Sequence, residues 1–182
     1  MKLPITILSV LLGISLLANA GSSEPANKAA LRLVLSEVQP GALSSAQYCM
    51  LVFDDHNFHA EKAYSTNGKD RKRSVYQGRL SDAEWNALTA ILDAKPFRDL
   101  YVPPSAPTLV TEGLHPYAIS VARQKGFQNM EFMSKESLKP YRAKLKPLLE
   151  WWKSARSQSL PQSNAAVDSR CALSHPGAVF NN

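Results

Sequence analysis

The chain has no long apolar segment after its first twenty residues, so we expect no membrane-spanning helix in the rest of the sequence. It also has no Gly-x-Ser-x-Gly nucleophile elbow and no glycine-rich phosphate-binding loop. The local motifs of many hydrolases and nucleotide-binding enzymes are therefore missing. We expect a protein that is not an enzyme, with no catalytic residue, no cofactor and no bound metal.

Cysteine is scarce, and the two cysteines, Cys49 and Cys171, lie 122 positions apart. An even number of cysteines favours pairing in an oxidising compartment, and the N-terminal pattern described next predicts export to one, so we predict one disulfide that anchors the C-terminal tail. The alternative is a buried, unreactive Cys49 and a loose Cys171. Closing so long a loop is worth about 4 to 5 kcal/mol by the chain-entropy argument.

The first twenty residues have the pattern of an export signal. Lys2 precedes an apolar run over residues 5–17, and residues 18–20 read Ala-Asn-Ala, which is a typical cleavage site. We expect cleavage after Ala20, so that the mature protein spans residues 21–182. This pattern predicts an exported protein, located in the periplasm or in the medium.

The charge bias is mildly basic, with a formal net charge of +6. Most basic residues are scattered, and only the run Lys69-Asp70-Arg71-Lys72-Arg73 gathers them. This is less than the basic stripe of a nucleic-acid-binding protein, so we expect no specific nucleic-acid partner. Because the run follows the turn pair Asn67-Gly68, we expect a basic hairpin tip, which either contacts an anionic partner or is simply solvated.

Alternating apolar residues predict a series of strands. The expected strands are residues 31–38, 46–53, 58–64, 74–79, 117–121 and 127–132. Turn residues at Asp54–Asn57, Asn67-Gly68 and Lys125-Gly126 separate neighbouring strands. These short connections favour an antiparallel arrangement.

Two helices are expected, each with an apolar face. Ser81-Asp82-Ala83-Glu84 forms a capping-box sequence, and the helix that follows should end near Ala94. A second helical pattern runs from Leu138 to Trp152, and Pro147 inside it is expected to kink or divide that helix.

Together these elements predict an α+β fold: a mainly antiparallel sheet of five or six strands with two helices packed on one face. The expected organisation is a signal peptide over 1–20, a polar leader over 21–30, a single domain over 31–156, and a Ser/Gln-rich tail over 157–182 that the disulfide tethers.

The order of elements resembles a group of small secreted bacterial α+β domains of unknown function. The resemblance rests on residues 78–84, Gly-Arg-Leu-Ser-Asp-Ala-Glu, at the entry to the first helix, and on the exit of that helix from Asp93 to Phe97. The plan is also similar to emfourin-type metalloprotease inhibitors over residues 31–152. This resemblance implies an inhibitory function but carries over no functional residue.

Metal-type ligands gather locally at Asp54-Asp55-His56-Asn57-Phe58-His59. The turn residues predict a hairpin there, and side chains alternate between faces along a strand, so we do not expect His56 and His59 to converge on a metal. We expect a solvated turn. Glu61 and Asp99 are expected to be solvated surface carboxylates.

The expected function is an exported, non-enzymatic binding or interaction module whose ligand the sequence does not identify. Another protein is one candidate partner, and a protease inhibitor is the most specific form of this hypothesis. The alternatives are a structural component of the cell envelope and an enzyme whose site is assembled from distant residues. Prolines lower the cost of ordering a loop on binding. The expected contact surface comprises Lys69, Arg71, Lys72, Arg73, Val102, Pro103 and Pro104.

Overall fold

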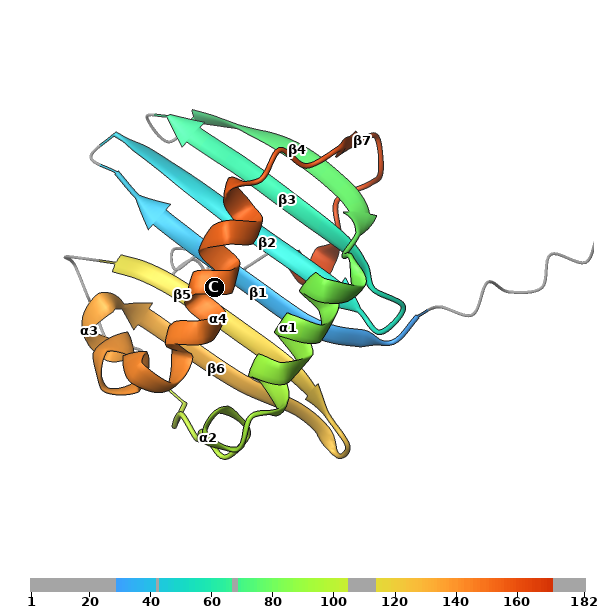
Figure 1. The fold of residues 1–182 in the computed structure, drawn as a ribbon. Helices are drawn as coiled ribbons and strands as arrows, with labels where there is room; N and C mark the ends of the chain where they lie inside the picture. Colours follow the sequence, from blue (N-terminus) through green and yellow to red (C-terminus); the bar gives the residue numbers. More distant parts are fainter. Residues whose placement is uncertain (1–28, 42, 67–68, 105–113, 172–182) are drawn as a thin grey trace, which may run out of the picture.

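The computed structural model describes residues 29–41, 43–66, 69–104 and 114–171. Their strands form one antiparallel sheet of seven strands in the order β6-β5-β1-β2-β3-β4-β7 (Figure 1). The α+β class and the antiparallel sheet are confirmed, whereas the expected count of five or six strands was too low. No helix in the described ranges is long and apolar enough to cross a membrane.

The first four strands form a meander, and a hairpin extends the sheet beside its first strand. The strands are β1 (Leu31–Pro40), β2 (Ser44–Phe53), β3 (Asn57–Thr66), β4 (Lys69–Arg79), β5 (Leu114–Arg123), β6 (Gly126–Ser134) and β7 (Gln162–Ser163). β5 pairs with β1, and β7 pairs with the outer edge of β4. All six expected strands are present, and the additional strand is the two-residue β7, which lies in the predicted tail. The expected turn at Asn67-Gly68 lies outside the described residues.

Two long helices, α1 (Asp82–Asp93) and α4 (Arg142–Ser157), cover the same face of the sheet (Figure 1). The predicted capping box of α1 is confirmed, because the Glu84 amide donates to Ser81 Oγ and the Ser81 amide donates to Glu84 Oε2. Four short helical segments complete the fold: α2 (Lys95–Arg98), α3 (Lys135–Leu138), and the 3₁₀ turns η1 (Lys139–Tyr141) and η2 (Ser169–Cys171).

α4 runs through Pro147 as one helix, so of the two outcomes expected at that residue, a kink or a division, the division does not occur. The interruption falls earlier, at η1, which contains Pro140. Pro147 removes the amide that would bond the carbonyl of Ala143. Both residues are exposed, so water can hydrate that carbonyl, and the helix tolerates the proline.

The main core lies between the sheet and the helices. The strands contribute Leu33, Leu35, Met50, Val52, Ile119, Val121, Met130 and Phe132, and the helices contribute Leu88, Leu92, Leu145, Leu148 and Trp152. Within each strand these residues are two positions apart and so face the same side of the sheet. This spacing is why the alternating sequence pattern predicted the strands.

A second, smaller core lies on the opposite face of the sheet, where Cys49, Leu51 and Cys171 are buried together. After α4 the chain pairs as β7 and then passes behind the sheet to η2 (Figure 1). The predicted disulfide between Cys49 and Cys171 is confirmed, with 5.5 Å between their Cα atoms. The tail up to residue 171 is therefore part of the domain.

Candidate functional site

Glu61 is a buried carboxylate between β3 and the tail, with 3% of its surface exposed. Its Oε1 accepts hydrogen bonds from His59 Nε2 at 2.8 Å and from the Asp168 amide at 2.6 Å. Its Oε2 accepts a hydrogen bond from Arg73 Nη1 at 2.6 Å. The expectation that Glu61 is solvated was wrong, because the tail covers this face of β3.

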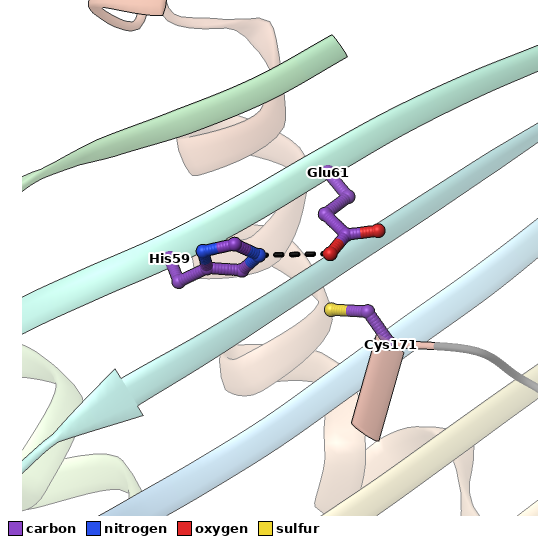
Figure 2. Close-up of side chains that lie close together, drawn as sticks. All are labelled: His59, Glu61 and Cys171. Carbon is purple, nitrogen blue, oxygen red and sulfur yellow. Dashed lines mark hydrogen bonds and ion pairs between the residues drawn. The ribbon is translucent and has the colours of Figure 1, made fainter. Parts of the chain in front are cut away.

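His59, Glu61 and Cys171 converge, as Figure 2 shows, and one potential ligand atom from each lies within 4.8 Å of the other two. The β-sheet explains the arrangement, since His59 and Glu61 are two positions apart on one strand and so share a face. Cys49 is the register partner of Glu61 on β2. In this state Cys171 is bonded to Cys49, so neither sulfur is a thiolate ligand.

His56 lies apart from this group. It occupies the β2–β3 turn with a positive φ of 70°, and its ring stacks on Trp85 with 4.5 Å between ring centroids. Its Nδ1 is 3.4 Å from Asp82 Oδ1 without hydrogen-bond geometry. The two histidines thus have different contacts, His56 with Trp85 and His59 with Glu61.

An open hollow of about 740 Å³ adjoins His59 on the tail side of the sheet. The charged side chains along it are paired among themselves or with the backbone: Arg170 binds both carboxylate oxygens of Asp168, and Arg79 donates to the carbonyl of Asp55. The hydrogen bonds from Arg170 hold the pKa of Asp168 at about 2, well below its usual value. This hollow therefore presents little uncompensated charge.

Glu37 is a second buried carboxylate, on the helix side of the sheet, with 1% of its surface exposed. Its two oxygens accept hydrogen bonds from Tyr117 Oη, Gln39 Nε2, Trp152 Nε1 and Arg156 Nη1, at 2.5 to 2.9 Å. Burial, followed by the charge of Glu37, raises the pKa of Tyr117. These bonds join β1 to β5 and to α4.

Next to this network, burial and a hydrogen bond with Tyr64 raise the pKa of Tyr48 to about 12. The guanidinium of Arg156 lies over the Tyr48 ring, 5.5 Å from its centroid. The sequence contained one signal that Glu37 is buried. Glu37 follows Leu33 and Leu35 at the same two-residue spacing, so all three side chains lie on the same buried face of β1.

A third group of charges is basic. Arg32, Arg98, Arg123 and Lys125 line a hollow of about 720 Å³ that contains one carboxylate, Asp93. Arg32 Nη2 binds both oxygens of Asp93, at 2.7 and 2.8 Å. Arg123 Nη1 lies 3.5 Å from the same carboxylate. Burial and the charges of Arg32 and Arg98 lower the pKa of Arg123, against the opposing effect of Asp93.

Four elements meet at this basic hollow: β1, the end of α1, α2 and the β5–β6 hairpin. Gln128 Nε2 on β6 donates to the carbonyls of Phe97 and Leu100, and Gln128 Oε1 accepts from Arg123. These bonds hold the chain after α2 in position beside Arg123.

No family model matches the chain, and no curated protein matches it. The geometry of these sites is therefore the basis for proposing a function.

The structure separates the two parts of the expected contact surface. Val102–Pro104 follow α2, near the β6 edge of the sheet, whereas the basic run begins β4 at the other side of the sheet (Figure 1). Pro103 and Pro104 are exposed, and Val102 packs partly against the core. Arg73 is engaged by Glu61. The side chains of Lys69, Arg71 and Lys72 lie outside the described part of the structure.

Sequence reasoning did not find the basic hollow, because its arginines come from positions 32, 98 and 123. No local run of charge marks these residues. Only the pairing of β1 with β5 and the packing of α2 bring them together.

Proposed function

We propose that this protein is an exported interaction module without catalytic activity, and that it binds an acidic segment of another protein at the basic hollow. The observation that carries the proposal is that, among the described residues, one carboxylate, Asp93, lines the hollow together with four cationic side chains, Arg32, Arg98, Arg123 and Lys125.

The charge imbalance favours an anionic partner. Arg32 holds Asp93 through two hydrogen bonds, so that carboxylate is largely committed. Arg123 is only 19% exposed, and the one carboxylate that it contacts in the described part of the chain, Asp93 at 3.5 Å, is shared with Arg32. A carboxylate from a partner would supply the missing charge, and the planar guanidinium fork matches a carboxylate well.

The surroundings favour a protein segment over a small anion. Tyr101 is 74% exposed, and the exposed Pro103 and Pro104 follow it. Tyrosine and arginine are enriched among residues that dominate protein interfaces, and prolines reduce the entropy lost when a loop binds. The partner segment should therefore combine acidic and apolar residues.

The absence of catalysis in this proposal is supported by the engagement of both buried carboxylates. Glu37 and Glu61 accept hydrogen bonds that connect separate elements of the fold. A general base needs an oxygen directed at a substrate proton. Export is supported by the disulfide, which persists in oxidising compartments, and by the N-terminal pattern.

Charge reversal at the hollow tests the proposal. Arg98→Glu with Lys125→Glu changes two exposed side chains of the hollow, and Lys135→Glu with Lys153→Glu is the control of equal net charge. The probe is a fluorescent peptide of six glutamates and one tryptophan, and the readout is anisotropy. We expect the hollow variant to bind at least about tenfold more weakly than wild type, and the control to stay within about twofold. Equal weakening in both variants would contradict a specific site.

Protease inhibition is a second candidate, favoured by the exposed segment Tyr101–Pro104 next to a turn that Gln128 holds. The test is incubation with a secreted metalloprotease, with residual protease activity and intact mass as readouts. Inhibition with the segment intact would support this version. Rapid cleavage of the segment without inhibition would contradict it.

A further inference from the structure

We propose that reduction of the Cys49–Cys171 disulfide creates a zinc site from Cys49, Cys171, His59 and Glu61. Two thiolates, one imidazole and one carboxylate are a donor set typical of zinc in proteins. This proposal is independent of the basic hollow and of its partner.

The sheet positions three of the four residues. Cys49 on β2 is the register partner of Glu61 on β3, and Leu51 is the partner of His59. The sulfur of Cys171 already lies within 4.8 Å of ligand atoms of His59 and Glu61 (Figure 2), and the sulfur of Cys49 is bonded to it.

The pair His59 and Glu61 needs only a small movement to admit the ion. Zinc bonds of about 2.0 to 2.3 Å in a tetrahedron place neighbouring ligand atoms roughly 3.3 to 3.8 Å apart. His59 Nε2 and Glu61 Oε1 are now 2.8 Å apart, so these two atoms must separate by less than about 1 Å. The two sulfurs separate once their bond is broken.

The surrounding charges suit a bound zinc ion. Two thiolates and Glu61 contribute three negative charges, and Zn²⁺ with Arg73 contributes three positive charges, so the buried group is neutral. Arg73 holds Glu61 Oε2, whereas Oε1 faces His59 and also accepts a hydrogen bond from the Asp168 amide. Gln47 Nε2 donates to the Cys171 carbonyl at 3.2 Å and keeps that residue near the sheet. Such outer contacts orient metal ligands.

The redox step is an exchange with a dithiol reductant. One reductant thiolate attacks a sulfur of the disulfide and forms a mixed disulfide, and the second reductant thiolate then releases the protein cysteine. Two electrons pass to Cys49 and Cys171, the reductant leaves as its own disulfide, and the protein gains two protons. Zinc binding expels these protons as the thiols become thiolates. The oxidised protein offers only His59 and Glu61, too few ligands for a stable zinc site.

Metal titration of the mature, full-length protein tests this inference. The protein is reduced with a water-soluble phosphine, which becomes the phosphine oxide with oxygen from water, and is titrated with Co²⁺ and then Zn²⁺. We expect one metal ion per reduced chain, a thiolate-to-cobalt charge-transfer band that zinc abolishes, and no uptake by the oxidised protein. His59→Asn and Glu61→Gln should each weaken zinc binding at least about tenfold. His56→Asn is the matched control and should bind like wild type.

The comparison of oxidised with reduced wild-type protein keeps the test independent of how well the variants fold. Far-UV circular dichroism monitors folding in each sample, and we expect zinc to raise the melting temperature of the reduced protein only. A reduced protein that remains free of metal would overturn the proposal. Equal zinc affinity in His59→Asn and His56→Asn would overturn it as well, since the ion would then be bound elsewhere.

Discussion

At the scale of single residues, two glutamates connect the layers of this molecule. Glu37 joins the sheet to α4, and Glu61 joins β3 to the tail and β4. A buried carboxylate of this kind is stable only with its donors in place, because each unpaired charge in a low-dielectric interior is costly.

Glu37→Ala should destabilise the protein by about 3 to 5 kcal/mol, because it leaves the Arg156 charge and the Trp152 indole N–H without their acceptor. Urea denaturation followed by tryptophan fluorescence measures the free energy of unfolding. Asp99→Ala, at an exposed ion pair with Lys95, is the control and should leave that free energy unchanged within error. A loss below about 1 kcal/mol for Glu37→Ala would show that the network does not stabilise the fold.

Asp168 should make the stability of the protein sensitive to acid. Its hydrogen bonds with Arg170 lower its pKa from 3.8 to about 2, so the folded state favours the charged form. Its contribution is therefore complete above about pH 4 and is lost as the pH falls through about 2. The side chain is 23% exposed, so solvent screening limits the contribution to the order of 1 kcal/mol.

The check is urea denaturation of wild type and Asp168→Asn at pH 6 and at pH 2. At pH 6 the wild type should have the larger free energy of unfolding. At pH 2 this difference between wild type and Asp168→Asn should largely disappear. A difference that does not change with pH would contradict the assignment.

At the scale of elements, the sequence predicted what local pattern controls. Alternation located six strands, and Ser81 with Glu84 marked the start of α1. Local pattern did not reveal β7, because a two-residue strand has no periodicity and depends on β4 beside it. Local pattern also gave a wrong expectation of a solvated Glu61, because the tail that buries this residue is distant in the sequence.

The tail should come loose when its covalent tether is removed. Cys49→Ala with Cys171→Ala is expected to lower the free energy of unfolding by about 2 to 5 kcal/mol, because the disulfide restricts a loop of 122 positions in the unfolded chain. Hydrogen exchange should accelerate for residues 162–171 while β1 and β2 stay protected. Unchanged exchange in the tail would mean that β7 and the contacts of Glu61 hold it without the disulfide.

At the scale of the whole molecule, the fold class was predictable and the candidate site was not. An antiparallel sheet with helices on one face follows from two periodicities and short turns. The basic hollow depends on which strands pair and where α2 packs, and the buried donor set behind the sheet depends on the path of the tail. No short stretch of sequence contains the full set of residues of either site.

The proposed export and the disulfide together predict the mass of the purified protein. The purified mature protein should begin at Gly21 and weigh two hydrogens less than its dithiol form, and reduction with alkylation should label both cysteines. Intact-mass spectrometry under denaturing conditions reads both features. A chain that retains residues 1–20, or two thiols that alkylate without reduction, would contradict the account.

The most direct test of the central claim is to locate the peptide on the protein. Titration of the ¹⁵N-labelled mature protein with the glutamate and tryptophan peptide, followed by NMR, reports which amides respond. We predict that shifts concentrate at the hollow, around Arg98 and residues 123–126, and that they diminish as salt is added. Shifts confined to the basic run Lys69–Arg73, or spread evenly over the surface, would contradict a binding site at the basic hollow.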